Sequence, residues 1–219
     1  MMLLRRRPRP APEPPGQEVP TLVLKPALEE LAWRSAPRVL DLGPAVTANV
    51  ERFAAVEARV HVADLHSSLL RQGRPPGSGV DWQRVLPPRG ESFDLILAWD
   101  LLNYLNPEEI TTLARELAYH CRRETLLMAA ISIRDPLPPR PGRYELTSLE
   151  TMRCTFEGQS GTRKDAGRPS PRYRELQLLR WLEGFTVRRA FLLRHGVQEY
   201  LFAYEATPPE NPAGRIPPP

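Results

Sequence analysis

The sequence predicts an α/β fold in which a seven-stranded sheet, mostly parallel and closed by a C-terminal antiparallel hairpin, carries helices on both faces. Three patterns predict it. A compact apolar strand at 39–42 passes through a turn into an amphipathic helix at 48–56. A buried strand at 93–99 precedes another helix and strand, and two final strands, 186–194 and 198–206, are separated by a short turn. Alternating strands and helices favour a parallel, Rossmann-like sheet, and the short last connection favours a hairpin.

The other elements follow from hydrophobic spacing. Helices are expected at 24–33, 67–72, 107–123 and 173–183, and strands at 58–65 and 124–132, with a weak strand at 80–86. The helix after Asn106 is the best defined. Asn106 can cap it, Pro107 suits its first position, and the two glutamates that follow favour the positive end of its dipole.

Composition fits one folded domain with disordered ends. The chain has 219 residues, 41% of them hydrophobic, and its 26 prolines crowd both ends and the region near residue 138. We expect a disordered Pro/Arg-rich tail at 1–21, one domain at 22–206 and a disordered Pro-rich tail at 207–219. We also expect 134–172 to be an irregular loop or lid with a short helix near 148–154, because it is long and polar.

Charge and apolar patterning narrow the partners. The net charge of +4 is matched by arginines in the N-terminal tail, so nucleic acid is not an expected partner. A basic loop at 143–174 or the Pro-rich tails could contact a protein. No apolar run approaches the roughly 20 residues that cross a bilayer, so we expect no membrane contact and a cytoplasmic protein. Cys121, Cys154 and the histidines lack metal-ligand spacing, so no metal site is expected.

Acidic residues follow three of the predicted strands. Asp41 ends the first strand, Asp64 the second, and Asp100 the strand at 93–99. The carboxyl ends of parallel strands face one crevice, where open α/β sheets bind ligands. Asp64 comes about 20 residues after Asp41, the spacing at which an acid reaches a ribose diol. Two structural alternatives remain: Asp64 could cap its strand, and Asp41 could bond the backbone amides of its own turn.

Four motifs occur in order between residues 24 and 206. They are Val39-Leu-Asp-Leu-Gly43, Val62-Ala-Asp-Leu65, Ser92-Phe-Asp-Leu-Ile-Leu-Ala-Trp-Asp-Leu-Leu-Asn-Tyr-Leu105 and Tyr173-Arg-Glu-Leu-Gln-Leu-Leu-Arg-Trp-Leu-Glu-Gly-Phe185. With the terminal hairpin, this order resembles the class I S-adenosylmethionine-dependent methyltransferases. The resemblance implies S-adenosyl-L-methionine as cofactor and methyl transfer to an acceptor, which we expect to be a small molecule.

The resemblance implies cofactor-binding roles for residues of the first two motifs. Asp41 would lie near the ammonium of the methionine part, and the turn from Gly43 to Ala45 would let the backbone approach the cofactor. Asp64 would hold the ribose hydroxyls, and Leu65 would pack on the adenine.

Further roles are implied for the middle of the chain. Asp81 would accept the adenine amino group with the Trp82 backbone beside it, although simple packing is the favoured alternative for this pair. Trp99 and Asp100 would flank the sulfonium. Asn103 and Tyr104 would face the acceptor. His66 and Tyr104 are placed to act as bases, and neither is assigned that role.

The glycine turn departs from the pattern of the family. Gly43-Pro-Ala-Val-Thr47 stands where Gly-x-Gly-x-Gly is usual, and the side chains of Ala45 and Thr47 would occupy space near the cofactor. Pro44 could even start the helix directly and leave no cradle. Two hypotheses follow: a methyltransferase, and a catalytically inactive interaction module that keeps the sheet without the cofactor.

Overall fold

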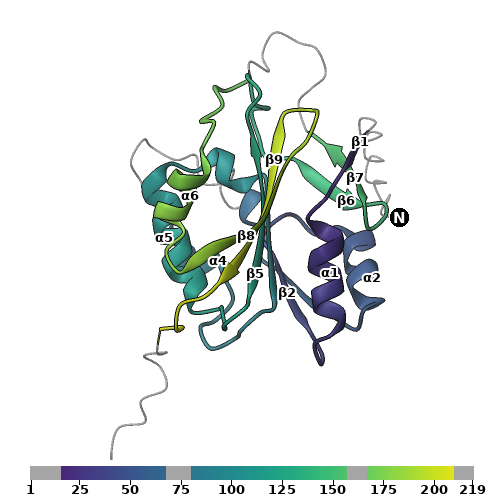
Figure 1. The fold of residues 1–219 in the computed structure, drawn as a ribbon, viewed down its shortest axis with the longest axis vertical. Helices are drawn as coiled ribbons and strands as arrows, with labels where there is room; N and C mark the ends of the chain where they lie inside the picture. The colour runs from purple at the N-terminus through teal and green to yellow at the C-terminus, as the bar shows by residue number, and fades with distance from the viewer. Residues whose placement is uncertain (1–15, 68–79, 157–166, 210–219) are drawn as a thin grey trace, which may run out of the picture.

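The computed structural model describes residues 16–67, 80–156 and 167–209. Its main sheet has six strands in the order β3-β2-β4-β5-β9-β8 (Figure 1). Their bounds are β2 Arg38–Asp41, β3 Arg59–Val62, β4 Leu95–Trp99, β5 Leu126–Ser132, β8 Phe185–Leu192 and β9 Val197–Tyr204. Strands β3, β2, β4 and β5 are parallel, and β9 runs antiparallel to both β5 and β8. The mostly parallel sheet with its antiparallel hairpin is confirmed.

The predicted strand at 80–86 is wrong, and the sheet therefore has six strands instead of seven. This segment forms the short helix α4, Trp82–Val85. The indole of Trp82 is 3% exposed and donates a hydrogen bond to Thr112 Oγ1 on the neighbouring helix at 3.0 Å. Two prolines at 87 and 88 follow, and proline restricts the backbone of the residue before it. Packing of one large side chain thus decides this segment.

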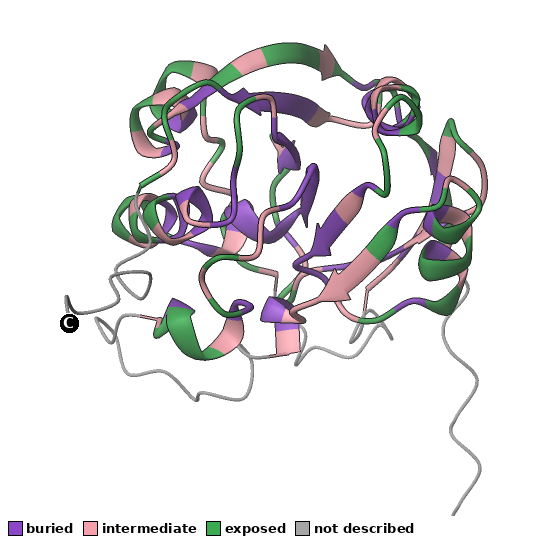
Figure 2. Ribbon diagram, turned by 90° about the horizontal axis from the view of Figure 1, so that it is seen from below, coloured by how far each residue is buried: buried purple, intermediate pink, exposed green. Residues whose placement is uncertain are grey.

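Helices cover both faces of the sheet (Figure 1). Helices α1, Leu24–Ala32, and α2, Thr47–Ala54, lie on one face, and α4, α5, Pro107–Ala118, and α6, Glu175–Trp181, lie on the other. The predicted cap of α5 is confirmed, because Asn106 and Glu109 form a reciprocal capping box. Buried strands form the middle layer and the exposed sides of the helices face outward (Figure 2). Within the described residues, no helix is long and apolar enough to cross a membrane.

A second, three-stranded sheet lies above α1 and α2 (Figure 1). It has the order β1-β7-β6, with β1 at Gln17–Pro20, β6 at Arg143–Leu146 and β7 at Thr151–Thr155. Residues 17–20 therefore form a strand and not part of a disordered tail. The region 134–172 contains a hairpin in place of a wholly irregular loop, and the helix expected near 148–154 is wrong. Met152 and Cys154 are buried while Arg153 between them is more exposed, which is strand periodicity.

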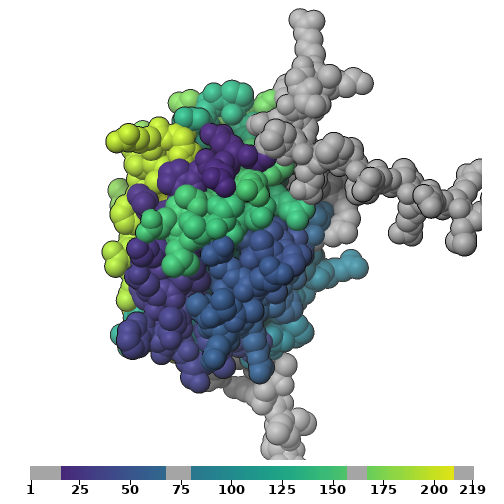
Figure 3. Space-filling model, turned by 90° about the vertical axis from the view of Figure 1, so that its right-hand side faces the viewer, coloured from purple at the N-terminus to yellow at the C-terminus, as the bar shows by residue number. Residues whose placement is uncertain are grey.

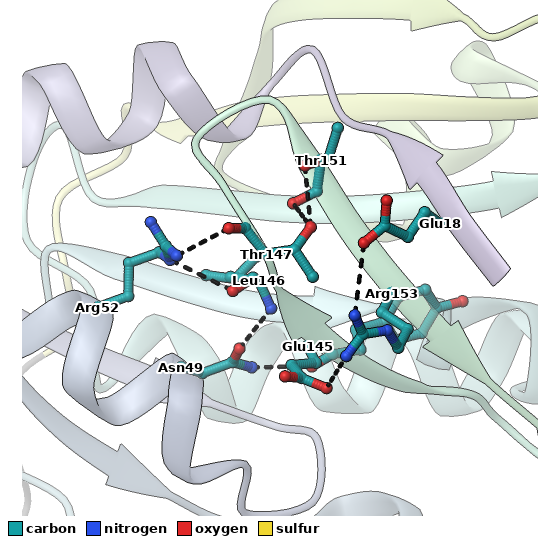
Figure 4. A network of polar contacts seen from close by, with 9 residues as sticks. Glu18, Asn49, Arg52, Glu145, Leu146, Thr147, Thr151 and Arg153 are labelled. Atoms are coloured by element: carbon teal, nitrogen blue, oxygen red, sulfur yellow. Dashed lines mark hydrogen bonds and ion pairs between the residues drawn. The ribbon is translucent and has the colours of Figure 1, made fainter. Parts of the chain in front are cut away.

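Side chains of α2 hold the hairpin in place (Figure 4). The Asn49 side chain, 1% exposed, donates to the carbonyl of Tyr144 at 2.9 Å and accepts from the amide of Leu146 at 2.8 Å. Arg52 donates to the carbonyls of Leu146 and Thr147 at 3.3 and 3.0 Å. These bonds satisfy backbone groups along the outer edge of β6, a need that every buried strand edge has. The hairpin is therefore fixed above the ends of the main sheet.

Candidate functional site

The structure brings the predicted acids together at one edge of the sheet. Asp41 ends β2, and Asp64 follows β3, its parallel neighbour. Asp100 follows β4 on the other side of β2. The charge of Asp64 contributes to the raised pKa of Asp41, so these two carboxylates are close enough to interact. The predicted crevice at the carboxyl ends of the strands therefore contains Asp41, Asp64 and Asp100.

The carboxylate of Asp41 is bonded within the chain. Its Oδ1 accepts hydrogen bonds from the amide of Gly43 at 2.8 Å and from Trp99 Nε1 at 2.7 Å. Asp41 is 2% exposed, and burial raises its pKa to about 6, although these two bonds oppose the rise. The turn bond that we considered for Asp41 is present. The indole bond was missed, and its only sequence signal is a tryptophan at the end of a buried strand.

Trp99 occupies the space beside the glycine turn. A Cβ on Gly43 would lie 2.8 Å from Trp99 Cδ1, so only glycine allows the indole this close. Trp99 has a φ of +48°, and the pairing of β4 with β5 shifts register just before it. The ring of Tyr144 stacks on the indole with centroids 5.4 Å apart and planes 2° apart. Trp99 and Tyr144 together cover the Gly43 turn.

The glycine turn leads into α2 through residues whose side chains were expected to lie near the cofactor. Ala45 and Thr47 are both exposed, and α2 begins at Thr47. Residues 44–46 thus form a turn before the helix, and Pro44 does not start it. The obstruction comes from Trp99 on the neighbouring strand.

Two neighbouring residues of the second motif, Asp64 and Leu65, lie in different places, the first in the crevice and the second in the apolar core. Asp64 is half-buried with a φ of +44°, and its Oδ1 accepts a hydrogen bond from the amide of Ser67 at 3.0 Å. This bond matches the capping alternative and leaves the ribose role of Asp64 a prediction. Leu65 is 0% exposed and belongs to the apolar core on the α5 side, so its side chain is packed against protein.

Asp81 and Trp82 lie apart from the three acids. They line a shallow pocket of about 260 Å³ against α5. Asp81 is exposed, and the Trp82 indole is bonded to Thr112. The packing interpretation of Trp82 agrees with this arrangement.

A buried acid and a buried imidazole face each other across the crevice. Asp100 Oδ2 accepts a hydrogen bond from the amide of Gly142 at 3.0 Å, and Asp100 Oδ1 lies 4.0 Å from His66 Nε2. Asp100 is 7% and His66 4% exposed. In the described part of the chain, Asp100 Oδ1 and both ring nitrogens of His66 have no hydrogen-bond partner. Buried polar atoms are normally paired, so these three atoms mark a place for a ligand or water.

Burial shifts both groups toward their neutral forms. It raises the pKa of Asp100 to about 7, against the opposing hydrogen bonds from Gly142 and Tyr144. It lowers the pKa of His66 to about 4. A carboxyl group that titrates near pH 7 can take up or release a proton under physiological conditions, which is the property of a general acid or base. The arrangement therefore supports proton transfer at Asp100.

The two residues predicted to face the acceptor lie in the 3-10 helix η1, Leu101–Tyr104. The amide of Asn103 donates to the carbonyls of Asp100 and Ala130, both at 2.8 Å, and accepts from the amide of Ser132 at 2.9 Å. Tyr104 donates to the carbonyl of Arg140 at 2.8 Å. Both residues line a narrow pocket of about 70 Å³ together with Asp100. Their hydrogen bonds hold the crevice wall in place.

Among the described residues, no group of three or more His, Cys, Asp or Glu side chains is placed to hold a metal ion.

Comparison with solved structures identifies the architecture. A S-adenosylmethionine-dependent methyltransferase from Clostridium acetobutylicum aligns with a TM-score of 0.51 and 14% sequence identity, over 84% of this chain and 91% of that one. This is a methyltransferase fold. The N-methyltransferase NodS from Bradyrhizobium japonicum aligns with a TM-score of 0.48 and 16% identity, over 83% of this chain and 94% of that one. No protein-family model and no curated protein matches the sequence. At these low sequence identities, the similarity shows that the chain shares the fold of these proteins.

Proposed function

We propose that this chain binds S-adenosyl-L-methionine and transfers its methyl group to a small-molecule acceptor in the cytoplasm. The observation that carries the proposal is the unpartnered Asp100 Oδ1 beside unpartnered His66, buried where β4 ends. This is the place that the sequence resemblance gives to the reacting groups. The methyltransferase fold and the neighbouring Asp41 and Asp64 support it. The buried, unpaired Cys121 and Cys154 agree with a reducing compartment.

The residues present fit the two ends of this cofactor differently. Asp64 is half-buried at the end of β3 and can accept hydrogen bonds from a ribose diol. At the Gly43 turn the space is filled by Trp99, whose indole N–H donates to Asp41. The methionine part does not fit beside Gly43 while Trp99 lies there. Binding therefore requires that the Trp99 side chain turn away from Asp41.

The chain's own contribution to the chemistry is at Asp100. The cofactor supplies an electrophilic methyl group when bound. A small acceptor that must lose a proton can give it to Asp100 Oδ1, because the pKa of this buried carboxyl is about 7. Tyr144 and the Gly142 amide orient the carboxyl group, and the hairpin above it excludes water.

One observation favours the second hypothesis, an interaction module without cofactor. Trp99 makes to Asp41 the kind of contact that the resemblance gives to the ammonium of the cofactor. A chain that fills its own methionine site in this way would keep the fold and lose the ligand. The two hypotheses differ in whether Trp99 can be displaced.

Thermal unfolding with millimolar S-adenosylmethionine or S-adenosylhomocysteine tests the proposal. Binding at 100 times the dissociation constant stabilises a protein by about 2.7 kcal/mol, so a shift is expected for the wild type. Asp64→Ala should abolish it, and Trp99→Ala should enlarge it by opening the space at Gly43. Trp33→Ala is the matched control, because Trp33 is 89% exposed. If neither the wild type nor folded Trp99→Ala shifts, the chain is not a methyltransferase and the interaction module stands. A shift retained by Asp64→Ala removes the ribose role of Asp64.

A further inference from the structure

A cavity of about 410 Å³ lies between the small sheet and the ends of β5 and β9. Side chains of all three strands of the small sheet, including Val19, Tyr144 and Met152, form one wall. Ala130 and Val197, on β5 and β9, contribute to the other. The small sheet, with β6 and β7 in green beside β1 in purple, lies on this side of the molecule above α1 and α2 (Figure 3). The volume is that of a small-molecule site.

The wall that the small sheet presents to this cavity is mainly apolar and aromatic, with Gln17 and Thr155 as its polar members. Tyr144 and Phe156 both line it, with their rings edge to face at 6.4 Å between centroids. Met152 adds a thioether, which packs well on aromatic rings. The charged residues of the same strands are on the opposite side, where Arg153 pairs with Glu18 and Glu145 (Figure 4). The cavity therefore favours a flat, apolar ligand.

The mouth of the cavity is cationic. Arg134, from the segment after β5, and His195, from the turn between β8 and β9, both line it. The Arg134 side chain lies across Gly196, where a Cβ would come within 2.8 Å of its Cγ. Burial and the charge of Arg134 lower the pKa of His195. Among the described residues that line the cavity none is acidic, so an anion on the ligand would find Arg134 as its partner.

The inner end of this cavity leads toward Asp100. The pocket of about 70 Å³ that contains Asp100 shares Ala130, Tyr144, Phe156 and Val197 with the larger cavity as wall residues. A ligand held at its anionic end by Arg134 would therefore extend along the wall that contains Tyr144 and Phe156 toward the carboxyl group of Asp100.

We infer that this cavity binds a small aromatic carboxylate, with the carboxylate at Arg134 and the ring against Tyr144 and Phe156. If the proposed function holds, this class of molecule is the methyl acceptor, and the group that it presents to Asp100 is the one that is methylated. Binding of the carboxylate does not itself depend on the cofactor.

Isothermal titration with 2-naphthoate as the probe tests this inference. The wild type should bind 2-naphthoate about tenfold more tightly than the neutral 2-naphthamide, because a hydrogen bond to a charged group is worth at least this factor. Arg134→Ala should remove the difference, and Arg134→Glu should reverse the preference. Arg134 is exposed, so both variants are expected to fold. Arg194→Ala is the matched control, an exposed arginine in the turn between β8 and β9 that does not line the cavity.

Three results would overturn the inference: no binding of 2-naphthoate to the wild type, binding that Arg134→Ala leaves unchanged, and binding that Arg194→Ala weakens as much as Arg134→Ala does. The cofactor is tested separately with Asp64→Ala, which should lose the S-adenosylmethionine shift and keep 2-naphthoate binding. If the wild type shows the S-adenosylmethionine shift but does not bind 2-naphthoate, only the acceptor class is wrong. If it binds 2-naphthoate but shows no S-adenosylmethionine shift, only the methyltransferase function is wrong.

Discussion

One buried aspartate lies at each end of β4, and the two carboxyl groups differ in how many hydrogen-bond and charged partners they have. Asp94, just before the strand, is 0% exposed and accepts hydrogen bonds from Arg34, Arg122 and the amide of Arg38. Asp100, just after the strand, is 7% exposed, and its Oδ1 has no partner among the described residues. One carboxylate is fully paired, and the other is left half-paired.

The pKa values of the two groups follow this difference. Burial alone would raise the pKa of Asp94, but hydrogen bonds from Arg122 and Arg38 and the charges of Arg122 and Arg34 hold it below its usual value. Burial raises the pKa of Asp100 to about 7 because no cation compensates it. A paired carboxylate stabilises the fold, whereas an unpaired one costs stability and is available to a ligand. The amino end of the sheet is thus structural, and the carboxyl end is the candidate site.

The largest expected effect is that of Asp94→Ala. Removing the carboxylate deletes its hydrogen bonds to Arg34, Arg122 and the amide of Arg38, and because hydrogen bonds to a charged group contribute about 1.5–3 kcal/mol each, a loss of about 3 kcal/mol or more of unfolding free energy is expected. Urea unfolding at pH 7 measures the loss. Because the folded pKa is depressed, the contribution of Asp94 is present at neutral pH and is lost as pH falls through the folded pKa. The control is Glu150→Ala, whose partner Lys25 is exposed, and little change is expected. Equal losses in the two variants would contradict the structural role of Asp94.

Asp100→Asn should act in the opposite direction. The folded pKa of about 7 lies above the unfolded value, so ionisation of Asp100 costs stability increasingly as pH rises from about 4 to 7. At about 1.4 kcal/mol per pKa unit the full cost is about 4 kcal/mol, and because the asparagine amide is a poorer acceptor than the carboxylate for Gly142 and Tyr144, the variant should be more stable than the wild type by about 1–3 kcal/mol at pH 8. The two free energies of unfolding should converge near pH 4. A constant difference across this range would show that Asp100 does not titrate near pH 7.

These contrasts explain which parts of the molecule could be predicted from the sequence. Strands β2 and β4 and helix α5 have strong local signals, namely apolar runs and the Asn106 cap. Strand β1 does not, because Gln17 pairs with Cys154 far along the chain and four residues give little periodicity. Long-range pairing of short strands depends on tertiary contacts that local patterns do not contain.

The same limit applies to the site. The position of Asp41, Asp64 and Asp100 at neighbouring strand ends follows from the parallel order of the sheet. The order of the sheet does not predict the hydrogen bond from Trp99 to Asp41, nor the placement of Asp100 beside His66 without a hydrogen bond between them. Both depend on backbone turns such as the φ of +48° at Trp99. Side-chain direction at a strand end is set by such turns, and no sequence pattern indicates this one beyond the tryptophan itself.

Trp99→Phe tests the hydrogen bond between Trp99 and Asp41 at the carboxyl end of the sheet. It removes the indole donor to Asp41 and keeps an aromatic ring against Tyr144, so we expect a loss of about 1.5–3 kcal/mol, the value of one hydrogen bond to a charged group. The pKa of Asp41, about 6 in the wild type, should rise because the indole bond lowers it. Urea unfolding and carboxyl NMR titration measure the two effects. Trp33→Phe is the exposed control. A pKa of Asp41 that does not rise would show that the indole bond does not stabilise the carboxylate.

The smallest expected effect is that of Glu199→Gln, which tests whether an unpaired carboxyl oxygen alone defines a site. Glu199 on β9 is 0% exposed, and its Oε2 accepts hydrogen bonds from the amides of Leu22 and Val23 just before α1. Its Oε1 has no hydrogen-bond partner within the part of the chain that the structure describes. It lines neither the larger cavity nor the Asp100 pocket. A glutamine can accept the same two amides, so a change below about 1 kcal/mol in unfolding free energy is expected, with 2-naphthoate binding unaltered. Weaker naphthoate binding by this variant would show that Glu199 also affects the cavity. An unpaired carboxyl oxygen would then not by itself distinguish Asp100 from Glu199.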